Sequence, residues 1–482
     1  MSARGFTIWV FAAAAAVWLL MFSGVPLGVP GEWTWPRHPA GVFAVVGLAV
    51  VAGLYVFAVD GLAQRLGPSR MAGPALIAAG FAMTVAALHA VDSAAPAAGA
   101  SRSPWVLYLS GTSGYFREAF ESDQSAGQFL RGYEATVAEG EYLHQGTHPP
   151  GLILAYRVLT AAVRAAPPLQ SVAAGLSSTA WRDSVSVLFE TSGRPADPVA
   201  AATLWWASTL TVLAHAAAAW PLWLLLRRVL DDTTAWRVAA LWPLVPAGFV
   251  FLPKSDCLFP VLGLSVAVLW LRGCDGRGGA ALAAGLVACG ALLLSLAPGP
   301  VFAAVAVGTV VHAAVRKETR RLWRPAAFGS AGFLLPLIGF GAAGLNVPAV
   351  WIQNLRNHAA FYDHFPRTYA AWLPVNLLEG VVAASLPVVV ACLGRREVRR
   401  RSRVDFVAWS VVAAWLLLWL SGKNMGEAAR LWVMLTPWPL VLLGLRGGVG
   451  RGHWRVLAAA AAVAFVAVAT RVDGFNLAAA GS

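Results

Sequence analysis

Two histidines and two prolines form a polar run at residues 140–151 of this 482-residue chain. The prolines that follow His148 exclude a helix until the chain restarts beyond Pro150. His144 and His148 are therefore expected at the mouth of the next helix, where their side chains can meet a substrate.

Acidic side chains precede that run, at Glu118, Glu121 and Asp123. A carboxylate close to the lipid interface can act as a general base if a neighbour holds its pKa near the working pH. The same spacing also fits an amphipathic helix that lies along the membrane surface with its charges in water.

A second polar run, residues 252–257, is a very short turn between two apolar stretches. It carries Lys254 and Asp256 close to membrane depth, where isolated charges are costly and usually functional. A local ion pair that defines the turn is the alternative.

The third run, residues 420–430, carries Lys423, Asn424, Glu427 and Arg430. Backbone N–H groups at the start of a helix, together with cations, form an anion-binding surface, and phosphate is the natural ligand. Alternatively, Glu427 and Arg430 simply bridge each other at the i to i+3 spacing.

The fourth run, residues 346–372, holds Arg356, His358 and Tyr362 beside further aromatic residues. Aromatic faces beside charged groups commonly bind sugar rings or charged headgroups. Anchoring at the lipid interface explains the aromatics equally well. No metal-binding motif of the HExxH kind is present, and the four cysteines have no ligand spacing, so we predict no metal site.

Composition indicates which elements position these runs. The chain is 58% hydrophobic, only 12% charged and has a mean hydropathy of +0.65, which favours an all-α, multi-pass membrane protein with one domain spanning 1–482. Apolar runs long enough to cross a hydrocarbon core of about 30 Å recur along the chain. The thirteen predicted spans are 6–23, 39–59, 73–91, 199–226, 235–252, 257–271, 279–296, 300–315, 325–345, 373–393, 405–420, 430–446 and 455–470.

Basic residues cluster in every second gap between these spans. Lys and Arg are retained on the cytoplasmic side, so the clusters predict a cytoplasmic N-terminus, an extracytoplasmic C-terminus and a cell-membrane location. The net charge of +13 is then explained by topology, and we expect membrane lipids as partners and no nucleic acid. The polar loops 92–198 and 346–372 face outward together.

The stretch 149–166 is apolar enough to be one more span. A full crossing there would invert every later loop and put the arginine clusters outside. We therefore expect a re-entrant or interfacial helix.

The four runs in this order resemble membrane glycosyltransferases of the C-type fold. The likeness rests on the run from Thr147 to Gly151, on an aspartate after a span, and on Gly426, Glu427 and Arg430 followed by Leu431 and Trp432. It covers roughly 73–446 and is closest to uncharacterised bacterial members of the superfamily that includes protein mannosyltransferases and aminoarabinose transferases.

The resemblance implies an inverting transfer of a sugar from a polyprenyl-phosphate donor to a hydroxyl of a glycan, lipid or protein, outside the cytoplasm. It implies a general base at Glu121 or Asp123, with Glu118 behind them, and no certain cofactor beyond the lipid-linked donor. A divalent metal has no support in the sequence. The family's Asp-Glu pair is not clearly present, because Asp92 stands alone. The expected substrate- and donor-binding residues are His144, His148, Lys254, Asp256, Arg356, His358, Tyr362, Lys423, Asn424, Glu427 and Arg430.

A transporter or flippase of a lipid or small solute is the alternative. Transporters usually carry ionisable groups near the bilayer midplane and paired halves with broken helices. The predicted spans are nearly free of such charges and no halves match.

Overall fold

The computed structural model describes residues 2–39, 41–92, 99–140, 145–394, 402–475 and 477. The chain is 77% helical, which confirms the all-α class. In the described part, the only sheet is a hairpin of β1 (Gly28–Val29) and β2 (Trp33–Thr34).

Four long helices form one side of the bundle. They are α1 (Ala3–Phe22), α2 (Val42–Leu66), α3 (Ala72–Asp92) and α24 (Arg451–Arg471). The first packs along α24, which also contacts α2, and α2 pairs with α3. The alanines of α24 are buried, and their small side chains let the neighbouring helices approach closely.

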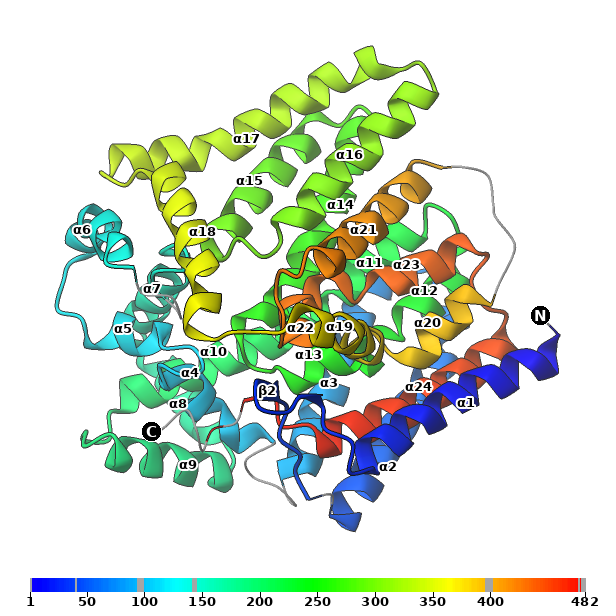
Figure 1. Ribbon diagram of the computed structural model, residues 1–482, viewed down its shortest axis with the longest axis horizontal. Coiled ribbons are helices and arrows are strands. Elements are labelled where there is room, and N and C mark those ends of the chain that lie inside the picture. The colour runs from blue at the N-terminus through cyan, green and yellow to red at the C-terminus, as the bar shows by residue number, and fades with distance from the viewer. Residues whose placement is uncertain are drawn as a thin grey trace.

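The segment between α3 and α10 folds into short helices. Figure 1 shows α5, α6, α8 and α9 at the end of the long axis opposite the N-terminus. The helix α7 begins at Gly151, directly after the two prolines, and meets α8 at 98°, as in a broken span or a re-entrant loop. The elements are η2 (Ala100–Arg102), α4 (Ser103–Tyr108), α5 (Tyr115–Glu121), α6 (Ala126–Ala138), α7 (Gly151–Ala165), α8 (Pro167–Leu176) and α9 (Thr179–Thr191).

The middle of the chain supplies a second group of packed helices. α15 packs between α14 and α17, and α16 packs against α21 (Figure 1). Their bounds are α10 (Pro198–Ala217), α11 (Ala219–Leu226), α14 (Phe259–Cys274), α15 (Gly278–Leu294), α16 (Gly299–Val315), η5 (Thr319–Leu322), α17 (Trp323–Ala342), α18 (Val347–His364) and α21 (Arg403–Leu420).

Three predicted spans are broken. Proline has no N–H to donate, and Pro246, Pro387 and Pro439 each lie in the first turn of a new helix. The resulting pieces are α12 (Asp232–Ala239), η3 (Trp242–Leu244) and α13 (Pro246–Val250); α19 (Tyr369–Ala383) and α20 (Leu386–Leu393), bent by 93°; and α22 (Ala428–Leu431), η6 (Val433–Leu435) and α23 (Trp438–Leu445). The last short element, η4 (Ser255–Leu258), precedes α14.

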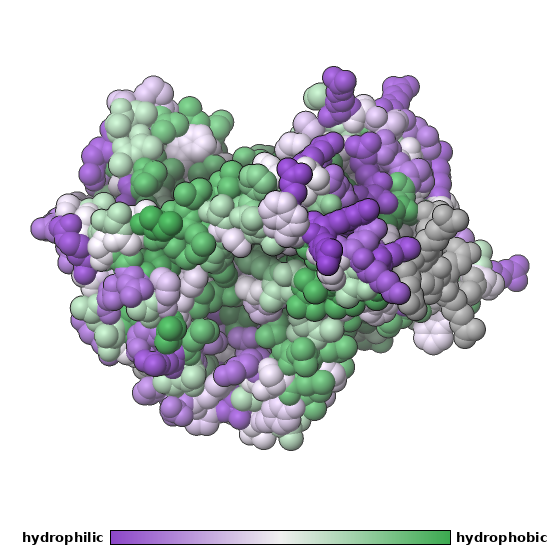
Figure 2. Space-filling model, turned by 90° about the horizontal axis from the view of Figure 1, so that it is seen from above, coloured by the Kyte–Doolittle hydropathy of each residue, from purple (hydrophilic) through white to green (hydrophobic). Residues whose placement is uncertain are grey.

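Eight helices of the described residues are long and apolar enough to cross a membrane, or up to ten if each bent pair counts as one span. These helices make the protein multi-pass, but the predicted number of thirteen is not reached by length and composition. The helices α15 and α16 are too short to qualify. Figure 2 shows hydrophobic residues across the middle of one face and a dense group of hydrophilic side chains toward one end.

Arginines from the predicted inner loops hold the helix ends together through two carboxylates. Asp60 contacts Arg237 at 3.4 Å, Arg451 at 3.3 Å and Arg455 at 2.7 Å, which joins α2, α12 and α24. A second carboxylate, Asp275 beyond α14, contacts Arg228 at 2.8 Å and Arg403 at 2.9 Å.

Candidate functional site

Lys254 is a buried cation in the turn between α13 and η4. Its side chain is 6% exposed, and Nζ donates to the carbonyl oxygen of Thr112 at 2.5 Å. Burial, with a further contribution from the positive Arg430, lowers the pKa of Lys254 to about 8. No carboxylate of the described residues lies within 4.0 Å of this ammonium, so it remains available to an anionic ligand.

Three further charged residues lie within electrostatic range of Lys254: Asp256, Glu427 and Arg430. Glu427 and Arg430 form the ion pair that was the alternative to anion binding in this loop, with N–O distances of 2.9 Å. These two side chains are partly buried, and Asp256 is buried. The four residues, here called the Lys254 cluster, come together because η4 packs against η6.

The backbone before α22 is not a regular helix start. Asn424 and Glu427 both have positive φ, at 65° and 56°, and α22 is only four residues long. Its Ala429 N–H donates to the carboxylate of Glu379 at 3.3 Å. The expected phosphate-binding backbone therefore faces a carboxylate here, and the cationic side chains are the groups suited to an anion.

Helix α18 holds the same loop from its other side. The Tyr362 hydroxyl accepts from the Met425 N–H at 2.8 Å, and the Asn424 side-chain oxygen accepts from Trp432 at 3.3 Å. His358 lies near Lys423, and its pKa is lowered by burial and by that positive charge. In contrast, Arg356 and Lys423 are exposed.

The two long polar loops predicted to face outward are hydrogen-bonded to each other. Asn354 and Asn357 of α18 donate to the Gly146 carbonyl at 2.7 and 2.8 Å. Tyr133 donates to the His148 carbonyl at 2.9 Å, and the His148 ring lies edge-on to Tyr115 at 5.5 Å. His144 lies outside the described residues.

The acidic residues of α5 and the following turn have different surroundings. Glu121 accepts from the Tyr108 hydroxyl at 2.8 Å and pairs with Arg117 at 3.3 Å and Arg194 at 2.9 Å. Glu118 is partly buried and lies near the charge of Arg157. Asp123 is exposed. Glu121 is thus neutralised by its neighbours, which favours a stabilising role for this carboxylate.

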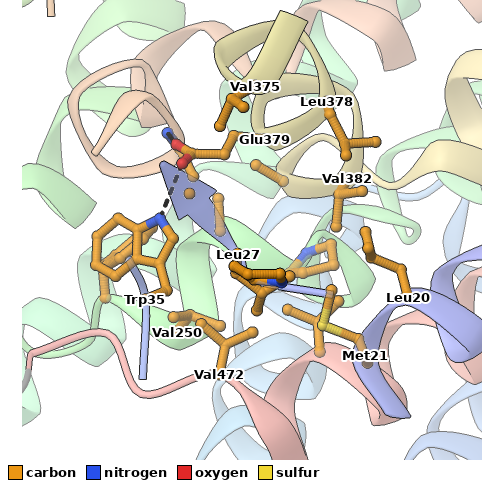
Figure 3. Close-up of a pocket in the computed structure, with 18 residues that line it drawn as sticks. Leu20, Met21, Leu27, Trp35, Val250, Val375, Leu378, Glu379, Val382 and Val472 are labelled. Carbon is orange, nitrogen blue, oxygen red and sulfur yellow. Dashed lines mark hydrogen bonds between the residues drawn. The ribbon is translucent and has the colours of Figure 1, made fainter. Parts of the chain in front are cut away.

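An apolar cleft of about 90 Å³ is lined in part by Ala429, the residue before Arg430, while the four residues of the Lys254 cluster are not among its lining residues. Figure 3 shows Glu379 of α19 as its labelled acidic residue, accepting from the Trp35 ring N–H at 3.2 Å. Ala429 lines the cleft, donates to Glu379 and immediately precedes Arg430. The cleft walls come mostly from α1, α13, α19, α24 and the chain around β1.

Sequence reasoning missed two residues that shape this region. Arg102 is 2% exposed and donates to the carbonyls of Val250 and Leu252 at 2.7 and 3.1 Å, which fixes the turn that carries Lys254. Glu379 was detectable, because it is a carboxylate inside the predicted span 373–393 and such residues are rare in spans. No local pattern marks Arg102.

Comparison with protein-family models gives no match for this chain, and comparison with curated protein sequences gives none. Among the described residues, no group of three or more His, Cys, Asp or Glu side chains is arranged to hold a metal ion.

Proposed function

We propose that the protein is a membrane glycosyltransferase that moves a sugar from a polyprenyl-phosphate donor to a hydroxyl acceptor on the extracytoplasmic side. The observation that carries this proposal is an apolar cleft whose lining residue Ala429 directly precedes Arg430, one of the two cations of the Lys254 cluster. A lipid phosphate has two parts that complement this arrangement, an apolar chain for the cleft and an anionic head for the cations.

In this reaction, the acceptor oxygen attacks the anomeric carbon of the donor sugar and forms the new glycosidic bond. The bond between that carbon and the phosphate oxygen breaks, and polyprenyl phosphate leaves. Lys254 and Arg430 stabilise the charge that develops on the leaving phosphate, which is most effective where water is excluded. Burial of Lys254 supports this role.

A carboxylate must accept the proton of the acceptor hydroxyl. Asp256 is the candidate that the geometry favours, because it is buried and lies in electrostatic range of Lys254 and so of the proposed phosphate position. Asp123 and Glu118 remain the alternatives from the first outer loop. Glu121 is less suited, since two guanidinium groups already neutralise it.

The proposal includes thirteen crossings with a cytoplasmic N-terminus and an extracytoplasmic C-terminus. Each predicted span coincides with a helix or with a broken chain of helices, which supports this number. The ion pairs of Asp60 and Asp275 bring together arginines of several predicted inner loops, which supports a shared face for these loops.

The test is turnover by the purified protein in lipid nanodiscs with a panel of polyprenyl-phosphate sugars and simple hydroxyl acceptors. We expect stoichiometric release of polyprenyl phosphate and a product of inverted anomeric configuration. An Arg430→Gln protein of equal thermal stability serves as the matched control. Absence of release with every donor would contradict the proposal.

A transporter or flippase is a second candidate, favoured by one feature. The bent pair α19 and α20 carries Glu379 in an apolar cleft, and transporters use broken helices with buried ionisable groups. Movement of a labelled polyprenyl-phosphate lipid between leaflets of proteoliposomes, without cleavage, would support this alternative over the transferase.

A further inference from the structure

A polar pocket of about 410 Å³ lies where α11 and α14 end, among residues of the predicted inner loops. Apart from Leu224, its lining residues are all charged: Arg227, Arg228, Asp232, Arg272, Asp275 and Arg277. None of them belongs to the Lys254 cluster or to the apolar cleft. The pocket therefore requires a separate explanation.

Both carboxylates of this pocket are already paired. Asp232 accepts two hydrogen bonds from Arg227, at 2.6 and 3.0 Å. Asp275 divides its oxygens between Arg228 and Arg403, at 2.8 and 2.9 Å. The four arginines and two aspartates of the lining leave a formal charge of +2.

That excess charge belongs to Arg272 and Arg277. In the described ranges, neither side chain has a carboxylate within the 4.0 Å limit of an ion pair. Arg272 is in the last turn of α14, and Arg277 immediately precedes α15, on the opposite side of the same short turn. Two guanidinium groups without a carboxylate partner that line one pocket match the oxygens of a phosphate group.

We propose that Arg272 and Arg277 bind the phosphate of an anionic phospholipid in this pocket. A lipid is favoured over a free phosphate because the pocket is at the ends of α11 and α14, two apolar helices that pack against each other. Basic pockets between helix ends on the cytoplasmic side of membrane proteins bind anionic headgroups in this way. The site is independent of the proposed transferase chemistry.

The test measures the thermal stabilisation of the purified protein in detergent by short-chain phosphatidylglycerol, by phosphatidylcholine and by inorganic phosphate. We expect stabilisation by phosphatidylglycerol at concentrations where the other two have no effect. In the double variant Arg272→Gln and Arg277→Gln, the phosphatidylglycerol concentration for half the effect should rise on the order of tenfold.

The control removes two exposed cations from another inner loop, Arg316→Gln with Arg320→Gln, and should leave the response unchanged. A second variant, Asp275→Asn, removes the carboxylate partner of Arg228 and Arg403. It should lower the phosphatidylglycerol concentration needed for half of the stabilisation. Equal losses in the double variant and the control would overturn the proposed site. An equal response to inorganic phosphate would overturn the lipid as its source, and no response to either phosphate would overturn the proposal entirely.

Discussion

Two regions of the molecule use charge in opposite ways. Beside the predicted inner loops, Asp60 contacts three arginines and Asp275 contacts two. Around the Lys254 cluster, the buried ammonium of Lys254 donates to a backbone carbonyl, and Glu379 accepts from a tryptophan ring and a backbone N–H.

This difference separates carboxylates that arginines already neutralise from a buried cation without a carboxylate partner. A carboxylate surrounded by guanidinium groups is already neutralised and joins neighbouring elements. A buried cation held only by a neutral carbonyl gains further stabilisation when an anion arrives. By this criterion Glu121, with its two arginines, resembles Asp60 and Asp275 although it lies in the predicted outer loop 92–198.

The largest effect is expected from Arg430→Gln. Loss of a cation that stabilises the leaving phosphate should lower donor turnover by roughly 100- to 1000-fold. The thermal midpoint should change little, since the pair with Glu427 is only partly buried. Steady-state release of polyprenyl phosphate measures the effect. A lowered thermal midpoint with normal turnover per folded molecule would show that Arg430 has a structural role.

Substitutions of the acidic residues test whether Glu121 is a structural carboxylate or the general base. Asp256→Asn should lower turnover by about 100-fold or more, as for loss of a general base. The double variant Glu121→Gln with Asp123→Asn should mainly lower the thermal midpoint. If the double variant abolishes turnover and Asp256→Asn does not, the base lies in the first outer loop.

Asp60→Asn tests whether the ion pairs of Asp60 stabilise the fold. It leaves Arg237, whose side chain is 6% exposed, without its carboxylate partner, so the free energy of unfolding should fall by about 3 kcal/mol. Asp275→Asn is the control, with an expected loss below about 1 kcal/mol because Asp275 is 44% exposed. Thermal unfolding of both variants in one detergent provides the comparison. Equal losses would remove the distinction between the two ion networks.

Donor affinity should depend on pH through Lys254. Its pKa in the folded protein is about 8, below the ordinary 10.5, so the ammonium loses its proton as pH rises through 8. Donor binding should then weaken by up to about tenfold per pH unit above 8. Folding stability should move in the opposite direction, rising between pH 8 and 10.5, because the unfolded chain binds more protons there.

Binding of the donor across pH 6 to 10 checks this dependence, with Lys254→Arg as the comparison. Arginine stays protonated over that range, so the variant should lose the decline above pH 8. A decline that persists unchanged in Lys254→Arg would assign the titration to another group.

The smallest effect is expected from Tyr362→Phe. It removes the hydroxyl that accepts from the Met425 N–H, a contact of about 1 kcal/mol, and loosens the loop before Glu427. The KM for the donor should rise a few-fold while kcat is kept. An unchanged KM would mean that the loop is held without this hydrogen bond.

The helical class and the start of a helix after Pro150 were predictable because apolar length and proline positions are local properties. The sequence predicted that residues 254–256 and 427–430 lie on the same outer face, but it did not predict that they lie close together. Their proximity depends on η4 packing against η6, which are far apart in the sequence. The same applies to the contacts of Asn354 and Asn357 with Gly146, since nothing in either segment specifies its partner.

The breaks in three predicted spans show a second limit. Hydropathy treats 235–252, 373–393 and 430–446 as continuous apolar runs, although prolines divide each of them. Such breaks are tolerated where packed neighbours satisfy the freed backbone groups, and the pieces around η3 and η6 are almost entirely buried. Burial by distant helices cannot be seen in a local window of residues.

The most direct test of the Lys254 cluster is a cryo-EM structure in nanodiscs with an unreactive polyprenyl-phosphate sugar analogue. We expect the phosphate within hydrogen-bond distance of Lys254 Nζ and the Arg430 guanidinium, with the first isoprene units in the cleft beside Glu379. Analogue density elsewhere, with both cations in contact only with the protein, would contradict the assignment of this region as the donor site.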